Sequence, residues 1–307
     1  CLLHVRSHDF QQYGLNEPVS VSIGLALSEP AAFNLHELHA RADLAMYNAK
    51  RPGNRKIILH SDAIDDMRSL VSNRRINAVY NAVQRPECLL LRYPRIVRLP
   101  SRDLAYNEAQ VRIRHGDELL APETVLPVVR SHRLEVEFDL ALLRAIEEDT
   151  RIGRRPDAPG LYLNISALGL LDERVLQALA GMRVRAPDIE LVVGIEEAAL
   201  IQHYDPARLH MQRLRDTGCL VALDDFGSAY SSVRHLASLP VDMIKFDGAL
   251  IAQLASDVPK ERLMVGEFAN LVSGNGYRIV AKGVDSEEIM QRVEALGFDY
   301  AQGSHLD

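Results

Sequence analysis

Two adjacent aspartates, Asp224 and Asp225, are the residues of this sequence whose types and spacing point most directly to chemistry. They precede Phe226-Gly227, and neighbouring carboxylates repel each other unless a cation lies nearby. Asn164 and Glu108 offer a neutral oxygen and a third carboxylate. Oxygen ligands of this kind are the set that Mg²⁺ and Ca²⁺ prefer, so the sequence predicts a divalent metal site.

Polar residues recur where apolar runs of the sequence end. These positions are Asn164, Asp224-Asp225, Lys245, Lys282 and Gln302. A single residue of this kind could simply meet solvent at the end of a strand. In a parallel barrel, however, the carboxyl ends of the strands converge on one face, where active sites are built. Five such positions therefore favour one shared site.

The elements that must position these residues are short strands alternating with helices. Eight apolar runs have the length of strands: 89–93, 105–113, 161–165, 191–195, 219–223, 243–246, 278–281 and 298–302. Helical patterns separate most of them, including 138–147, 173–182, 206–217 and 287–296. This alternation predicts an α/β fold, a TIM-like (β/α)8 barrel rather than a doubly wound sheet.

Composition restricts the class of protein. The 307 residues are 47% hydrophobic and 25% charged, which is typical of a globular chain with a sizeable core. A net charge of −7 argues against a protein that binds DNA or other nucleic acid independently of sequence. Cys1, Cys88 and Cys219 form no CxxC pair, so neither a disulfide framework nor a thiolate zinc site is expected.

No apolar run approaches the roughly 18 residues that a membrane-spanning helix needs, and no signal peptide opens the chain. We therefore expect a cytoplasmic protein. The first residue is Cys1 rather than Met, which indicates a piece of a longer protein. The cytoplasmic part of a membrane-anchored protein remains a second interpretation.

The string from Asp224 to Ser232 resembles the DDFGTGYSS signature of EAL domains, the cyclic di-GMP phosphodiesterase family. Further matches are residues 108–112 to E-A-L-x-R, 163–166 to N-[LI]-S, 239–247 to LPVDxLKID, 281–285 to A-E-G-V-E and 302–303 to the final Q-G. The resemblance covers residues 76–307 and implies a TIM-like EAL barrel.

The amino-terminal part is similar to the tail of a GGDEF domain, the diguanylate cyclase family, through residues 21–24 and 41–50. The GGDEF signature itself is absent, so diguanylate cyclase activity is not expected. We predict an α+β GGDEF remnant over 1–58, a linker helix over 59–75 and an EAL domain over 76–307. Together the two resemblances imply a bacterial GGDEF-EAL signalling protein.

The resemblance assigns a metal site. In the family, Mg²⁺ or Mn²⁺ ions are held by the EAL glutamate, the Asn, a glutamate of an E-I-T-E segment, the DD pair and the glutamate of A-E-G-V-E. Carried over, Glu108, Asn164, Asp224 and Asp225 are the metal ligands here.

Two family ligands are replaced, because Gly194 and Lys282 stand at the remaining glutamate positions. The local formal charge changes by about +3, and each unit costs a nearby divalent ion on the order of several kcal/mol. We therefore expect weakened metal binding. Lys282 could neutralise Asp225 or extend into solvent, and Glu196 could reach toward the place that Gly194 leaves.

The resemblance also assigns catalytic and ligand-binding roles. Lys245 would orient the attacking water and Glu197 would support an active-site loop, both impaired by the changes at positions 194 and 282. The cyclic di-GMP ligand would meet four residues: Arg112, whose planar fork suits a phosphate, Asp247, Gln302 and Arg95. Pro94 stands where the family has a Gln, and Arg95 could compensate for it.

These features lead to three functional hypotheses. We prefer a degenerate EAL domain that acts as a cyclic di-GMP receptor or interaction module with little or no hydrolysis. The alternatives are an active metal-dependent phosphodiesterase that makes linear pGpG, and a scaffold that binds no nucleotide. The expected partners are cyclic di-GMP, a protein of a signalling pathway and a second EAL domain in a homodimer.

Overall fold

The computed structural model describes residues 23–25, 42, 46, 57–59, 75–116, 118–200, 204–227 and 238–306. The chain forms two compact units, Cys1–Arg74 and Arg75–Asp307. In the first unit, β1 (Ile23–Leu25) pairs in parallel with β2 (Ile57–Leu59). Most of the predicted GGDEF remnant and linker helix lies outside the described residues.

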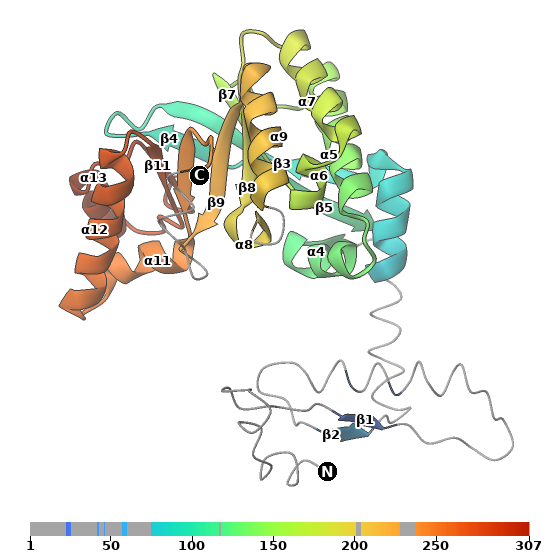
Figure 1. Ribbon diagram of the computed structural model, residues 1–307, viewed down its shortest axis with the longest axis horizontal. Helices are drawn as coiled ribbons and strands as arrows, with labels where there is room; N and C mark the ends of the chain where they lie inside the picture. Colours follow the sequence, from blue (N-terminus) through green and yellow to red (C-terminus); the bar gives the residue numbers. More distant parts are fainter. Residues whose placement is uncertain are drawn as a thin grey trace, which may run out of the picture. The chain divides into compact units, whose positions relative to one another are not determined.

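The second unit alternates strands and helices (Figure 1). Its strands are β3 (Leu89–Arg92), β4 (Arg95–Arg98), β5 (Leu104–His115), β6 (Glu118–Leu120), β7 (Gly160–Ile165), β8 (Glu190–Glu196), β9 (Leu220–Phe226), β10 (Met243–Phe246), β11 (Arg278–Lys282) and β12 (Tyr300–Gln302). Its described helices are a helical segment over 75–84, α4 (Pro122–Ser131), α5 (Glu135–Arg151), α6 (Ala167–Leu170), α7 (Glu173–Arg185), α8 (Glu197–Leu200), α9 (Tyr204–Asp216), α11 (Gly248–Ala252), α12 (Pro259–Gly274) and α13 (Glu287–Ala295), with 3-10 turns η2 (Pro86–Cys88) and η3 (Gln253–Ala255).

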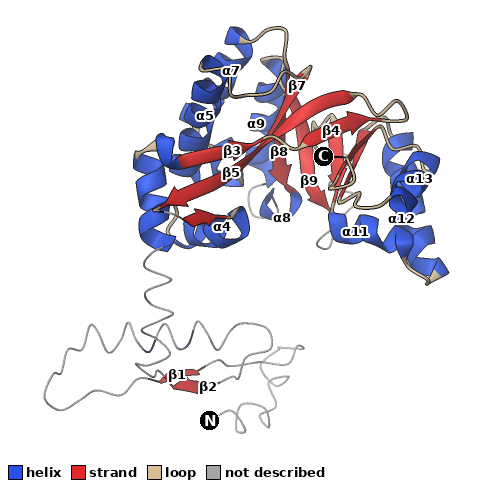
Figure 2. Cartoon of the chain, turned by 180° about the vertical axis from the view of Figure 1, so that it is seen from behind, coloured by secondary structure: helices blue, strands red, loops and turns tan. Residues whose placement is uncertain are grey.

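Eight strands close into a barrel, in the order β5-β4-β12-β11-β10-β9-β8-β7. Parallel pairing of β5 with β7, which sets Glu108 opposite Tyr162, completes the ring. β4 runs antiparallel to both of its neighbours, and the other barrel pairs are parallel. The predicted (β/α)8 barrel is confirmed, and Figure 2 shows helices packed around its strands.

One predicted barrel strand is wrong. The run at 89–93 forms β3, which among the described strands pairs only with β5 and lies outside the ring, and the eighth barrel strand is Arg95–Arg98. Proline has no N–H to give to a ladder, so Pro94 ends the first strand. The arginines at both ends of β4 hide its two buried residues, Ile96 and Val97, from a search for apolar runs.

The outer helices are positioned by their apolar faces and caps. Asp172 begins α7 by accepting a hydrogen bond from the Arg174 N–H at 2.8 Å. The helix then buries Val175, Leu176, Leu179 and Met182, whose spacing of three and four residues places them on one face. Of the helices in the described part, none is long and apolar enough to cross a membrane.

Candidate functional site

Inside the barrel, an apolar layer is followed by the polar residues that the sequence analysis selected. The apolar layer includes Tyr106, Tyr162, Val192, Ala222, Met243, Val280 and Tyr300. Two positions later on the same strands stand Glu108, Asn164, Gly194, Asp224, Lys245, Lys282 and Gln302. Strand side chains alternate with a period of two, so both sets point into the barrel. The second set lies at the carboxyl ends of the parallel strands and forms the candidate site.

Glu108 is the centre of this site and is only 3% exposed. Its Oε1 atom accepts hydrogen bonds from Lys245 Nζ at 2.9 Å and from Asn164 Nδ2 at 3.0 Å. Its Oε2 atom accepts hydrogen bonds from Gln302 Nε2 at 2.5 Å and from Gln110 Nε2 at 3.2 Å. These donors come from strands β5, β7, β10 and β12, so closure of the barrel is what assembles them.

Lys245 is completely buried and lies between two carboxylates, with Nζ 2.9 Å from Glu108 Oε1 and 3.6 Å from Asp224 Oδ2. Burial by itself would raise the pKa of Glu108, but the charge of Lys245 and the hydrogen bonds hold it below its usual value. Burial raises the pKa of Asp224, and repulsion from Glu108 adds to this effect against the attraction of Lys245. The ammonium therefore serves both acids as a built-in cation.

Asp225 has a left-handed backbone with φ of 53°, a conformation that aspartate tolerates better than most residues. Its N–H donates to Asp224 Oδ1 at 2.8 Å, and its own Oδ1 accepts a hydrogen bond from Lys282 Nζ at 2.6 Å. Burial would lower the pKa of Lys282, but the charge of Asp224 and the bond to Asp225 raise it. Lys282 thus pairs with Asp225 instead of extending into solvent.

Gly194 contributes no side chain to the site, and its neighbours have taken up the space. A Cβ atom at this position would lie 2.6 Å from Tyr162 Oη and well inside van der Waals contact of Asn164 Oδ1. Tyr162 is fully buried, and Lys245 Nζ lies 4.5 Å from the centroid of its ring. Position 194 therefore has no room for a carboxylate side chain in this arrangement.

The residues present do not match the ligand set of a two-ion centre. In the described part of the chain, no three His, Cys, Asp or Glu side chains are grouped to hold a metal ion. Three carboxylates, Glu108, Asp224 and Asp225, face two ammonium groups, which leaves a formal charge of −1. Two divalent ions would add +4 to a site with little charge left to balance them. The metal-ligand roles of these carboxylates and of Asn164 stay a prediction.

The glutamates of the β8–α8 segment lie apart from this network. Glu196 ends β8 and forms an ion pair with Arg130 of α4, so its carboxylate is engaged away from position 194. Glu197 begins α8 (Glu197–Leu200). The structure does not test its predicted catalytic role.

The predicted ligand contacts lie on separate elements. Arg112 is half-buried in β5, four residues after Glu108, beyond the part of the strand that pairs within the barrel. Arg95 begins β4 and donates a hydrogen bond to the Leu306 carbonyl at 3.3 Å. Because β4 is antiparallel, its amino end lies at the same edge as the carboxyl ends of the parallel strands. The carbonyl of Pro94 there accepts the Glu108 N–H at 2.9 Å.

Asp247 and Gln302 are positioned by the backbone. Asp247 caps α11 by accepting the Ala249 N–H at 2.8 Å, so one of its carboxylate oxygens is already engaged. Gln302 ends β12 and gives its amide to Glu108, while its Oε1 atom is buried with no partner among the described residues. An unsatisfied buried acceptor of this kind suits a donor supplied by a ligand.

Sequence reasoning missed two residues that shape the site. Tyr162 is hidden in an apolar run, and only its position two residues before Asn164 could have pointed to it. Asp139 of α5 is buried and accepts hydrogen bonds from the Ser166 N–H at 3.0 Å and from Ser166 Oγ at 2.7 Å. It therefore holds the turn that follows Asn164. A lone aspartate within a helical pattern gives no signal of this role.

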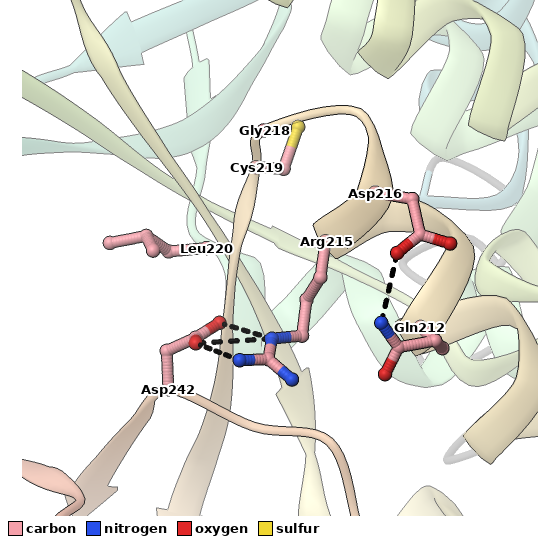
Figure 3. A pocket seen from close by; sticks show the side chains of 7 residues that line it. All are labelled: Gln212, Arg215, Asp216, Gly218, Cys219, Leu220 and Asp242. Carbon is pink, nitrogen blue, oxygen red and sulfur yellow. Dashed lines mark hydrogen bonds and ion pairs between the residues drawn. The ribbon is translucent and has the colours of Figure 1, made fainter.

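A pocket opens at the opposite end of the barrel, where β9 and β10 begin (Figure 3). Its charged groups satisfy each other, because Arg215 pairs with Asp242 at 2.8 Å and Asp216 accepts a hydrogen bond from Gln212 at 2.9 Å. Asp242 also accepts the Val221 N–H at 2.9 Å. Active sites of TIM-like barrels lie at the carboxyl ends of the strands, so this pocket is not the candidate site.

Comparisons with known proteins agree with this geometry. The family model "EAL domain" matches residues 76–307. Cyclic di-GMP phosphodiesterase PdeF of Escherichia coli (strain K12) is 28% identical over 204 residues, which is 64% of this chain and 27% of that protein. Cyclic di-GMP phosphodiesterase PdeB of Shewanella oneidensis is 27% identical over 297 residues, which is 94% of this chain and 34% of that protein. The chain thus spans about a quarter to a third of the length of these relatives.

Solved structures show the same fold. The PaMucR phosphodiesterase in complex with c-di-GMP is 25% identical with a TM-score of 0.67, covering 76% of this chain and 96% of that one. The FimX EAL domain of Xanthomonas citri in complex with c-diGMP is 20% identical with a TM-score of 0.68, covering 78% and 94%. With a barrel that carries the EAL motifs at its carboxyl edge and a family match over residues 76–307, the chain belongs to the EAL domain family.

Proposed function

We propose that this chain is a cyclic di-GMP receptor whose EAL domain hydrolyses the nucleotide slowly or not at all. The observation that carries the proposal is the ion pair between Lys282 and Asp225 at 2.6 Å. It places an ammonium where the family has a metal-binding carboxylate, and Gly194 omits a second one. In the family, carboxylates at these two positions help to hold the metal pair that activates water, so we do not expect efficient hydrolysis here.

Several features support cyclic di-GMP as the ligand. The PaMucR phosphodiesterase, whose structure was solved with this nucleotide, is 25% identical in sequence to the chain. Arg112 keeps the guanidinium that can hold a phosphate through two parallel hydrogen bonds. The buried, unsatisfied Oε1 atom of Gln302 offers an acceptor at the barrel mouth. Asp247 and Arg95 are proposed as further contacts, and Lys245 and Glu197 as remnants of the catalytic set.

A second candidate is a slow, metal-dependent phosphodiesterase that makes linear pGpG. It is favoured by retention of Glu108, Asn164, Asp224 and Asp225 and by the names of the relatives PdeF and PdeB. Mg²⁺ or Mn²⁺ would then be required, with binding weakened by the positive charge of Lys282. In either case a homodimer and a partner protein of a signalling pathway are proposed, and DNA is not.

One experiment separates these candidates: isothermal titration of the chain with cyclic di-GMP and Mg²⁺ or Mn²⁺, followed by chromatography of the recovered nucleotide. The expected result is saturable binding with the nucleotide recovered intact. Conversion to pGpG at about 1 s⁻¹ or faster, a rate ordinary for enzymes, overturns the receptor proposal. A titration without heat, confirmed by equilibrium dialysis, indicates the nucleotide-free scaffold instead.

Matched variants test whether the binding is specific. Arg112→Ala removes the proposed phosphate contact, and charge-assisted hydrogen bonds contribute about 1.5–3 kcal/mol, so the affinity should fall by about 10- to 100-fold. Arg151→Ala removes an exposed arginine that pairs with Glu148 at the end of α5, and it should leave the affinity unchanged. Equal effects of the two variants would contradict the proposed site.

A further inference from the structure

Tyr162 carries its phenol ring from β7 into the polar end of the barrel. The side chain is fully buried in the apolar layer and packs beside Lys245, whose Nζ lies 4.5 Å from the ring centroid. Its hydroxyl is buried beside the Asp224 carboxylate and makes no hydrogen bond of good geometry to the described residues. Because the ring is enclosed on every side, its packing determines where the hydroxyl lies.

The phenol occupies space next to Gly194. A Cβ atom on Gly194 would lie 2.6 Å from Tyr162 Oη and 2.8 Å from Tyr162 Cε1. The Tyr162 ring cannot move aside easily, because it is enclosed on all sides. Asn164, the other close neighbour of Gly194, is held by its hydrogen bond to Glu108. Tyr162 and any side chain at position 194 therefore exclude each other.

A second tyrosine in the same layer is a natural comparison. Tyr106 of β5 packs over Gly160, where a Cβ atom would lie 2.6 Å from Tyr106 Cε1. Its hydroxyl, however, bonds to Glu190 at the start of β8, the barrel end opposite to the candidate site. Both tyrosines thus fill space over a glycine, but only the Tyr162 hydroxyl faces the polar residues.

We infer that Tyr162 closes this site to divalent metal ions by filling the place of the carboxylate that position 194 lacks. The inference rests on the proposed function, because it explains how the site could bind a nucleotide without a metal pair. Three residues then act together. Gly194 lacks the metal-binding carboxylate, Tyr162 fills the space of that carboxylate, and Lys282 supplies a positive charge. Restoring the two carboxylates without removing the phenol will not restore a metal site.

The test compares Mn²⁺ binding, measured by isothermal titration and by the electron paramagnetic resonance signal of bound Mn²⁺. Gly194→Glu with Lys282→Glu should bind Mn²⁺ no more than about threefold more tightly than the unmodified chain. Adding Tyr162→Ala should tighten binding by about tenfold or more, which is about 1.4 kcal/mol. The control adds Tyr106→Ala instead, which removes a tyrosine ring whose hydroxyl lies away from the site. This change should leave the Mn²⁺ affinity unaltered. Equal Mn²⁺ affinity with and without Tyr162 overturns the inference.

A second measurement needs neither metal nor nucleotide, and it applies even if the multiple variants fold poorly. Gly194→Ala should lower the Tm of the chain by about 3 to 10 °C, as expected for an overpacked core. In a Tyr162→Ala background the contact with Asn164 Oδ1 remains but that with the phenol is gone, so the same change should cost less than about half as much, whereas in a Tyr106→Ala background it should keep its full cost. Equal losses in all three backgrounds overturn the inference.

The inference and the receptor proposal can be told apart when one of them fails. Rapid hydrolysis of cyclic di-GMP by the unmodified chain would end the receptor proposal and the closure to metal ions, and the Tm comparison would still show whether Tyr162 conflicts with a side chain at position 194. Conversely, a failed Tm comparison would remove Tyr162 from the explanation without bearing on nucleotide binding.

Discussion

Lys282 Nζ lies 2.6 Å from Asp225 Oδ1, and the two side chains remain 39% and 35% exposed. The pair lies at the rim of the barrel mouth, whereas the Lys245–Glu108 pair, at 2.9 Å, is almost completely buried within it. These two ion pairs therefore have similar lengths but different surroundings. Solvent screens the first pair and not the second, so their contributions to stability should differ.

Replacing the rim lysine should change stability little. Lys282→Ala breaks a partly exposed pair, and such pairs contribute about 0 to 1 kcal/mol to the free energy of unfolding. Urea unfolding of the variant checks this expectation, with Lys260→Ala as the control because Lys260 is exposed at the start of α12. A loss above about 3 kcal/mol would show that the pair behaves as a buried one.

Replacing the buried lysine should change stability greatly. Lys245→Met keeps an apolar stem of similar length but leaves Glu108 and Asp224 without their cation. Removing one partner of a buried pair costs about 3–5 kcal/mol. Urea unfolding should show this loss, while Lys260→Met should stay near the unmodified chain. Equal stabilities of the two variants would mean that water or other groups compensate the carboxylates.

Removal of metal should leave ligand binding intact. In the receptor proposal the lysines supply the positive charge of the site, so cyclic di-GMP should bind with the same affinity, within about twofold, in EDTA and in Mg²⁺. Isothermal titration in the two buffers at equal ionic strength measures this. A tenfold loss of affinity in EDTA would point to the metal-dependent phosphodiesterase.

Asp139 should make stability depend on pH. Burial raises its pKa to about 7 from the model-peptide value of 3.8, against the hydrogen bonds from Ser166. Because the folded pKa is the higher one, its contribution is fully present below about pH 4 and is lost as the pH rises through about 7. Asp139→Asn cannot ionise, so relative to this variant the unmodified chain should lose stability between about pH 4 and 7. Urea unfolding across this range measures the difference, and a flat difference would mean that the folded pKa is ordinary.

The pocket at the opposite end of the barrel should matter for stability alone. Asp242→Ala leaves Arg215 unpaired and the Val221 N–H without its acceptor, which should cost about 1–3 kcal/mol. Asp216→Ala in the same pocket removes only the bond from Gln212 and should cost less than about 0.5 kcal/mol. Both variants should bind cyclic di-GMP like the unmodified chain. Weaker binding by Asp242→Ala at an unchanged fold would contradict this.

The sequence by itself determined the barrel and the chemical types at its mouth. Buried parallel strands are apolar runs, so runs such as 161–165 and 219–223, and the polar residues near their carboxyl ends, could be predicted. It also indicated that Lys282 could meet Asp225, because both stand near the carboxyl ends of strands of one barrel. It did not find β4, since arginines enclose its two buried residues.

Only the tertiary structure decided how these residues meet. Glu108 and Gln302 are 194 positions apart in sequence, and their contact exists because β12 returns to pair with β4 and close the ring. The conflict between Tyr162 and a side chain at Gly194 depends on ring orientation across two strands, which no spacing encodes. Local periodicity determines which face a side chain takes, but the separation of atoms across a closed barrel follows from the stagger and tilt of all its strands.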